Sequence, residues 1–260
     1  MAVLLQMLWD LVLGYGDVLS SPFFPVLFSI SIYLLFCLPF LLLDCLSVWV
    51  APIRSYKIQP NNTISWGAAR SCLGLFLYNH LVYILPTTVL HWYWRPVSLP
   101  REAPGVPSLT CGVLACLLMF DFQYFVWHIL HHRIPWLYRT FHKVHHTFTA
   151  PSALTTEHSG AWEVLSLGFF AAINPCILGC HPLTELAFFL LNIWLSVEDH
   201  CGYDLPWAPH RWVPWGLYGG APHHDLHHLT FKSNYAPYFT HWDRLAGTLL
   251  RHHPKTDPRG

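Results

Sequence analysis

Two histidine clusters stand almost back to back near the middle of the chain. The first lies in Trp127-His128-Ile129-Leu130-His131-His132, and the second is His142-Lys143-Val144-His145-His146. In each cluster three histidines occupy positions i, i+3 and i+4, which share one side of a helix with about 3.6 residues per turn. The spacing predicts that each cluster directs three imidazoles to one place, as a metal site requires.

A third cluster of the same kind lies far downstream, where His224, His227 and His228 repeat the spacing. A single cluster could be a feature of a surface or a core, but three copies indicate metal binding. Nine imidazoles are too many for one ion and suit two ions with four or five nitrogens each. Structural zinc usually stops at four ligands, whereas imidazole-rich sites with open positions favour iron. The clusters therefore predict a dinuclear site that favours iron, which zinc can replace in a purified sample.

The composition is that of an integral membrane protein. Hydrophobic residues make up 53% of the 260 residues and charged residues only 11%, which is not a soluble balance. Lys+Arg and Asp+Glu are equal at 14 each, so no basic excess indicates nucleic acid as a partner. The eight cysteines contain no C-x-x-C pair, so the predicted site depends on histidine rather than on thiolate.

Three apolar stretches, residues 22–43, 72–91 and 109–128, are long enough to cross a hydrocarbon layer of about 30 Å. The third ends in the first histidine cluster, which places the predicted metal site at a membrane boundary. A fourth apolar stretch, from Ala161 to Val197, must leave this boundary and return to it, because the clusters on either side of it have to meet. Turn signals near its middle predict a helical hairpin, although the length does not decide whether its arms cross the bilayer fully.

The expected fold is therefore an all-α integral membrane protein. It has three transmembrane helices and a hydrophobic helical hairpin, capped by a cytosolic helical histidine-rich domain that holds the dinuclear site. We expect an N-terminal membrane region at residues 1–108 and a catalytic region at 109–260. This topology puts 12 of the 14 Lys and Arg residues on the histidine side, which the positive-inside rule assigns to the cytosol.

Further candidates lie next to the clusters. Asp121 shares a helical stripe with His128, and a carboxylate at this depth is costly unless it has a partner. It either orients a ligand histidine or bonds to another span. At the return end of the hairpin His200 is either a tenth ligand or a helix cap, and Asp199 beside it is a second candidate for the surroundings of the metals. The sequence leaves open whether His131, His158, His210 or His223 bind metal.

The three clusters, together with residues 136–146 and 234–243, resemble the fatty acid hydroxylase/sterol desaturase superfamily. Three longer phrases narrow the resemblance to the branch that hydroxylates cholesterol at carbon 25; they are residues 21–26, 179–184 and 192–200. Mapped onto this chain, the resemblance implies the metal ligands His128, His131, His132, His142, His145, His146, His224, His227 and His228, which with the exception of His131 are also the expected catalytic residues. Relatives carry an additional H-x-x-x-H box on the return helix. Here Ser196 stands four residues before His200, so only His200 is available there, and a water, Glu198 or Asp199 could complete one metal.

The resemblance also implies a non-haem diiron monooxygenase of the endoplasmic reticulum membrane, with O2 and cholesterol or a related sterol as substrates. Electrons would come from NADPH through a separate reductase or a cytochrome b5-type donor, because this chain has no dinucleotide-binding motif of its own. A site at the edge of the bilayer independently favours an apolar substrate such as a sterol, a fatty acid or a ceramide.

Other functions stay compatible with the sequence. A sterol C4-methyl oxidase, a sterol desaturase or another lipid hydroxylase would use the same cofactor on a different carbon or with a different outcome. A non-enzymatic protein could keep the scaffold to bind a sterol or a partner. A histidine-rich metal carrier is disfavoured, because the predicted spans lack the polar path that such a carrier needs.

Overall fold

The computed structural model describes residues 2–251, and within this range the regular secondary structure is entirely helical. Three helices are long and apolar enough to span a membrane. They are α3 (Phe24–Ser47), a composite helix over Trp66–Trp94, and α7 (Val106–Arg133). The three predicted spans are thus found. The second and third are longer at both ends, and the first begins two residues later and ends four residues later than predicted, because a helix can continue past the hydrocarbon boundary into the polar layer. The chain is a membrane protein by this criterion.

The composite span changes its helical geometry halfway along. It consists of α5 (Trp66–Asn79), one π-helical turn η1 (His80–Ile84) and α6 (Leu85–Trp94). The wide turn comes directly before Pro86, whose ring has no N–H to donate and would clash with the carbonyl of the preceding turn in a regular helix. The π turn carries His80 to α3, where its Nε2 lies 3.1 Å from the Ser29 hydroxyl.

The predicted hairpin is confirmed as α9 (Ala161–Ile177) and α10 (Pro182–His200). The chain reverses at Gly179, which has a φ of +60° that favours glycine. Helix α10 packs against α3, α7 and α11 (Gly220–Thr230), while α9 packs against α7. Aromatic and aliphatic side chains such as Phe120 and Phe188 fill the interior between these helices. Because the hairpin returns to the boundary from which it starts, the end of α10 lies beside the histidines of α7.

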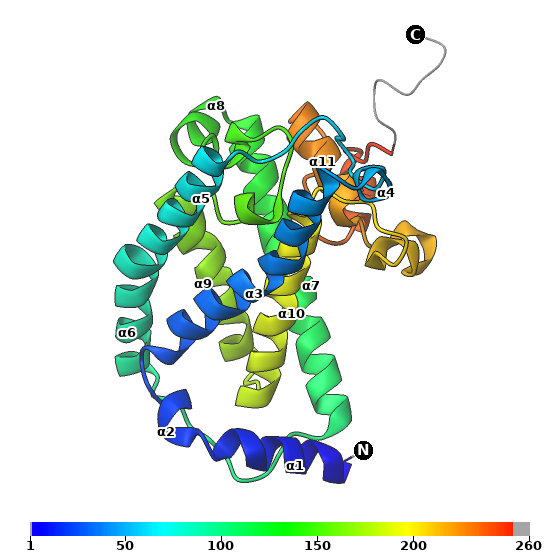
Figure 1. Cartoon of the computed structure of the whole chain (residues 1–260). Coiled ribbons are helices and arrows are strands. Elements are labelled where there is room, and N and C mark those ends of the chain that lie inside the picture. Colours follow the sequence, from blue (N-terminus) through cyan, green and yellow to red (C-terminus); the bar gives the residue numbers. More distant parts are fainter. Residues whose placement is uncertain (1, 252–260) are drawn as a thin grey trace.

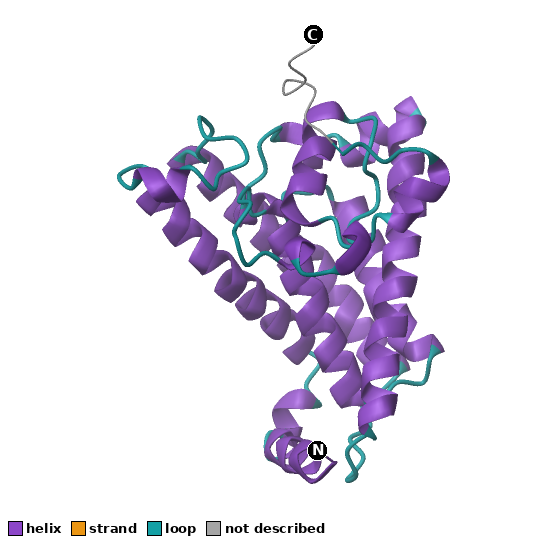
Figure 2. Ribbon diagram, turned by 90° about the vertical axis from the view of Figure 1, so that its right-hand side faces the viewer, coloured by secondary structure: helices purple, strands orange, loops and turns teal. Residues whose placement is uncertain are grey.

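The two ends of the molecule differ in character (Figure 1). At one end, the N-terminal end, α1 (Ala2–Leu13) and α2 (Gly16–Leu19) lie across the ends of the longer helices. Figure 2 shows loops and short helices gathered at the opposite end, which we call the histidine end. The short elements are α4 (Ala51–Arg54), α8 (Pro135–Leu137), η2 (Tyr138–His142), η3 (His145–Thr147), η4 (Ala153–Thr155), η5 (Pro209–Arg211), η6 (Pro214–Gly216) and α12 (His241–Ala246).

Candidate metal centre

Five elements bring histidines to one region. The last turns of α7 carry the first cluster, η2 and η3 carry the second, and α11 carries the third. His200 is the last residue of α10. Segments more than 90 residues apart in sequence therefore meet only because the hairpin returns to its starting boundary.

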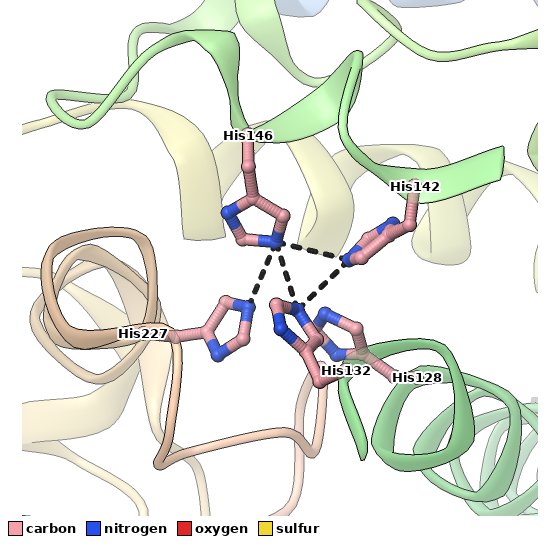
Figure 3. Close-up of side chains that lie close together, drawn as sticks. All are labelled: His128, His132, His142, His146 and His227. Atoms are coloured by element: carbon pink, nitrogen blue, oxygen red, sulfur yellow. Dashed lines mark hydrogen bonds between the residues drawn. The ribbon is translucent and has the colours of Figure 1, made fainter. Parts of the chain in front are cut away.

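The side chains collect in two groups in which the ligand atoms lie within 4.8 Å of one another. The five-histidine group is His128, His132, His142, His146 and His227, and Figure 3 shows their imidazoles turned toward a common centre. The four-histidine group is His145, His200, His224 and His228. Nine of the ten histidines proposed from the sequence are thus brought together, divided five and four.

The clusters do not each form one site, contrary to the expectation from their spacing. His145 and His146 are adjacent, yet they belong to different groups, and so do His227 and His228. In α7 and α11 successive residues are turned by about 100°, so positions i and i+4 differ by about 40° while i+3 and i+4 diverge by the full step. The pair at i and i+4 therefore shares a group in the first and third clusters. The second cluster, which lies on η2 and η3, shows the same division. The remaining histidine faces elsewhere.

Hydrogen bonds fix the tautomer of most of these imidazoles. The Nδ1–H of His128 donates to the carbonyl oxygen of Tyr235 at 2.6 Å, and that of His227 donates to Ser233 at 2.7 Å. The Nδ1 atoms of three further histidines also have oxygen acceptors, at distances of 2.9–3.0 Å. These histidines are His142, His200 and His228. Because carbonyl and carboxylate oxygens only accept, each Nδ1 carries the proton and each Nε2 keeps a free lone pair.

The Nε2 atoms of the grouped histidines point at one another. In the five-histidine group the Nε2 atoms of His132, His142 and His146 lie 2.9–3.0 Å apart. In the four-histidine group the Nε2 of His224 lies 3.0 Å from that of His200 and 3.1 Å from that of His228. Two lone pairs at this distance repel, and at most one proton could relieve a contact. A cation at each centre turns these facing lone pairs into ligands, so the donor set fits metal binding.

One buried atom supports the same conclusion. The Nε2 of His128 is buried without a hydrogen-bond partner among the described residues, while its Nδ1 is occupied by Tyr235. A buried polar atom that lacks a partner is costly unless something binds there. Its position within the five-histidine group makes a metal ion the fitting occupant.

Burial keeps the histidines outside the spans neutral. It lowers the pKa of His227 to about 4. Burial, followed by the neighbouring imidazoles, also lowers the pKa of His145, His146 and His224 well below the ordinary value. A neutral imidazole is the form that binds metal, so these groups are ready to act as ligands at neutral pH.

The two groups are neighbours. The imidazole of His146 in one group and that of His228 in the other have centroids 4.6 Å apart, and their planes are tilted by 38°. Contact between rings of the two groups means that two ions bound there would share a single site rather than occupy separate parts of the molecule.

The structure places His131 outside both groups. Its ring stacks on Trp127 at a centroid distance of 3.6 Å, and its Nδ1 contacts the Trp127 carbonyl at 2.7 Å. The other open candidates are also outside the groups: His210 pairs with Asp204, His223 pairs with Asp243, and His158 packs against Phe148.

The candidate acids are close to the site without touching its histidines. Asp121 accepts backbone N–H bonds from Tyr238 at 2.8 Å and Phe239 at 3.2 Å. Seven residues of helix separate it from His128 by about 10 Å, so its link to that histidine runs through the 235–239 segment. Asp199 accepts a hydrogen bond from the Tyr218 hydroxyl at 3.0 Å, which also donates to Glu198.

Sequence reasoning missed Glu163. Its Oε2 accepts the Nδ1–H of His142 at 3.0 Å, and the side chain is fully buried at the start of α9. A carboxylate that bonds the far nitrogen of a ligand histidine fixes the ring and raises its basicity. The signal was present, because an acid in the first turn of an apolar hairpin is expensive without a partner.

Asp243 braces the segment that holds His128. Its two carboxylate oxygens accept from the backbone N–H of Tyr235 at 2.8 Å and of Ala236 at 2.9 Å, and from Thr248 and His223. We expect Asp243→Asn to lower the free energy of unfolding by at least ~2 kcal/mol. The side-chain amide of asparagine would place its own N–H donor against a backbone N–H, and one of these donors would lose its acceptor. Thermal unfolding of the purified protein measures this. The half-exposed Asp204→Asn is the control, and equal midpoints for the two variants would contradict the bracing role.

A cavity of about 580 Å³ adjoins the metal centre. His200 and His224 line it, whereas the five-histidine group contributes none of its lining residues. From there it extends between α3, α7, α9 and α10 to the N-terminal end, where Trp9 and Arg95 line it. Its volume is within the ~300–1,000 Å³ typical of small-molecule sites. The lining is mostly apolar, so the cavity suits a lipid that reaches the four-histidine group.

Comparisons with known proteins agree with this site. The fatty acid hydroxylase family model matches residues 113–248. A cholesterol 25-hydroxylase-like protein of Danio rerio is 69% identical over 94% of this chain and 98% of its own length. Cholesterol 25-hydroxylase of Homo sapiens is 55% identical over 94% of this chain and 90% of its own, and a Caenorhabditis elegans relative is 36% identical over 94% and 81%. No solved structure matches significantly.

The family match contains all three histidine clusters and α10, and the relatives extend the likeness over the N-terminal spans. The superfamily resemblance seen in the sequence is confirmed. On the strength of the family model and of relatives that this chain covers almost completely, the chain belongs to the fatty acid hydroxylase family.

Proposed function

We propose that this protein hydroxylates cholesterol at carbon 25 and uses two iron ions held by the five- and four-histidine groups. The observation that carries the proposal is an apolar cavity of lipid size that reaches the four-histidine group, which in turn adjoins the five-histidine group. The high identity to proteins named cholesterol 25-hydroxylase supports the choice of substrate and carbon.

When bound, the iron ions supply the activation of O2. One oxygen atom enters the C–H bond, and the other leaves as water with two electrons and two protons. The electrons would come from NADPH through a separate reductase or cytochrome b5-type protein. The contribution of this chain is to hold the ligands in fixed tautomers and to keep water away from the reacting carbon.

The substrate would meet the four-histidine group first. His200 and His224 line the cavity, and Tyr238 and Phe120 form the adjoining wall. Tyr238 is held by its hydroxyl, which contacts Ser196 at 2.7 Å and donates to the Asn192 side chain at 2.9 Å. This rigid wall limits which carbon of a bound chain can approach the histidines, and so sets the position of hydroxylation.

Expression in cells without endogenous activity tests the function. Mass spectrometry of the sterols should find 25-hydroxycholesterol with the wild type and none with His145→Ala/His146→Ala. Methylated sterols offered in parallel separate the C4-methyl oxidase and desaturase alternatives. Binding of cholesterol without any oxidised product would favour a non-enzymatic role.

We further propose that residues 109–260 hold the catalytic machinery and that residues 1–108 form a membrane region that completes it. The tyrosine Tyr33 of α3 donates to the carbonyls of Ala153 and Leu154 at 3.3 and 3.1 Å. His80 of the second span lines the cavity. The first region therefore supplies part of the wall rather than a separate fold.

We place the protein in the endoplasmic reticulum membrane with the histidine end in the cytosol. The loop that carries the Asn61-Asn62-Thr63 sequon packs on this end, since Gln59 donates to Asp225 of the third cluster at 2.9 Å. Asn61 is exposed, so it would be glycosylated if this end faced the lumen. We expect no mobility shift on endoglycosidase treatment. A shift that disappears in Asn61→Gln would reverse the orientation.

A further inference from the structure

The cavity has a charged end far from the two histidine groups. Arg95, the residue that caps α6, and Glu185 in the first turn of α10 both line it there, with His91 one turn before Arg95. Arg95 is exposed and Glu185 is only partly buried, so neither side chain carries the full cost of a buried charge. Both are available to a polar group of a ligand at this end of the cavity.

Neither side chain is satisfied by the other. Within residues 2–251 the Glu185 carboxylate has no hydrogen-bond donor, and no ion pair joins it to Arg95. The Arg95 guanidinium contacts the Cys176 thiol through Nη1, which leaves most of its five N–H donors free. A hydroxyl group both donates and accepts, so it could donate to the carboxylate and accept from the guanidinium at once.

The spacing along α10 fits a sterol. Glu185 and His200 lie on the same helix and both line the cavity. Fifteen residues of helix separate them by about 22 Å, which is comparable to the length of a sterol. A sterol carries its single hydroxyl on carbon 3 of the rings and carbon 25 at the opposite end. If carbon 25 is at His200, the hydroxyl is at Glu185.

The charged end is covered by α1. Trp9 is fully buried, donates its indole N–H to the Pro100 carbonyl at 2.8 Å and packs edge-on against His181 at 4.8 Å. Trp9 also lines the cavity. A sterol ester has no proton on that oxygen to donate to Glu185, and its acyl group would need space beside Trp9.

We propose that Arg95 and Glu185 bind the 3-hydroxyl group of the sterol and thereby orient its side chain toward the four-histidine group. This assignment rests on the proposed function, since it takes the substrate to be a sterol. It makes the two residues determinants of substrate orientation and of specificity for a free sterol over a sterol ester.

Equilibrium binding tests the assignment without the need for turnover. Radiolabelled cholesterol is bound to the purified protein in phosphatidylcholine nanodiscs and competed with cholesterol, with its 3-deoxy analogue or with a cholesteryl ester. The wild type should prefer cholesterol to the 3-deoxy analogue by about tenfold or more, because a hydrogen bond to a charged group is lost. The ester should not compete.

The variants Glu185→Leu and Arg95→Leu should lose this preference. Their affinity for cholesterol should fall to that for the 3-deoxy analogue, while the affinity for the analogue stays at the wild-type value. Unchanged binding of the analogue shows that the cavity is intact. The matched controls are Glu102→Leu and Arg101→Leu, two exposed neighbours outside the cavity lining, which should keep the wild-type preference.

Three results would overturn the assignment. They are equal wild-type affinity for cholesterol and the 3-deoxy analogue, an equal loss of both ligands in the variants, and an Arg95 effect that appears only when anionic lipid is added. In each case formation of 25-hydroxycholesterol by the wild type would leave the proposed function standing. Failure of the wild type to bind any sterol would remove both proposals.

Discussion

His145→Ala and His146→Ala should each remove one metal ion, and each a different one, although the two residues are adjacent. His145 belongs to the four-histidine group and His146 to the five-histidine group. Iron content of the purified protein should fall from about two ions per chain to about one in either variant. Formation of hydroxylated sterol should fall by more than the ~10–100-fold typical of losing a partner outside the ligand set.

His131→Ala is the control for this experiment. It removes a histidine from the same type of cluster, yet His131 lies outside both groups and stacks on Trp127. Its iron content should equal that of the wild type. Loss of iron from His131→Ala, or one ion retained by the His145→Ala/His146→Ala double variant, would show that the groups are assigned wrongly.

Glu163→Gln should weaken metal binding at the five-histidine group by about 10–100-fold. Glutamine keeps the shape of the side chain but removes the charge that polarises the His142 ring through its Nδ1–H. The affinity can be measured by competition with a chelator, with hydroxylation as a second readout. The four-histidine group, which Glu163 does not contact, should keep its ion at chelator concentrations that empty the other group.

The matched control is Glu157→Gln. Glu157 is another acid of the cavity wall, but it forms no hydrogen bond with the grouped histidines in the described chain. Metal retention should be unchanged in this variant. If both variants released metal at the same chelator concentration, the effect would come from the charge of the cavity rather than from the bond to His142.

Much of the architecture could be predicted from the sequence, because it follows from local patterns. Apolar length alone located α3 and α7, and the breaker residues located the reversal at Gly179. The need for the clusters to meet then fixed the topology of the hairpin. The position of His200 near the clusters could be predicted in the same way, since the second arm of the hairpin had to end at the boundary where the first cluster lies.

The surroundings of the histidines could not be predicted in full. Backbone carbonyls such as those of Tyr235 and Ser233 accept from His128 and His227, and a sequence carries no sign of which carbonyl will lie where. Asp121 was singled out for its depth in a span, yet it holds the Tyr238 backbone. Its partner depended on which loop the fold brought to it.

The sequence by itself determined the chemistry of this protein, because imidazoles in a repeated pattern at the edge of an apolar span specify metal binding near lipid. Only the tertiary structure decided how the imidazoles are shared. The helical step of about 100° per residue separates neighbours in α11 such as His227 and His228, and the packing of α7, α10 and α11 decides which imidazoles face each other. That packing stacks His131 on Trp127, outside both groups, and makes His200 a member of the four-histidine group.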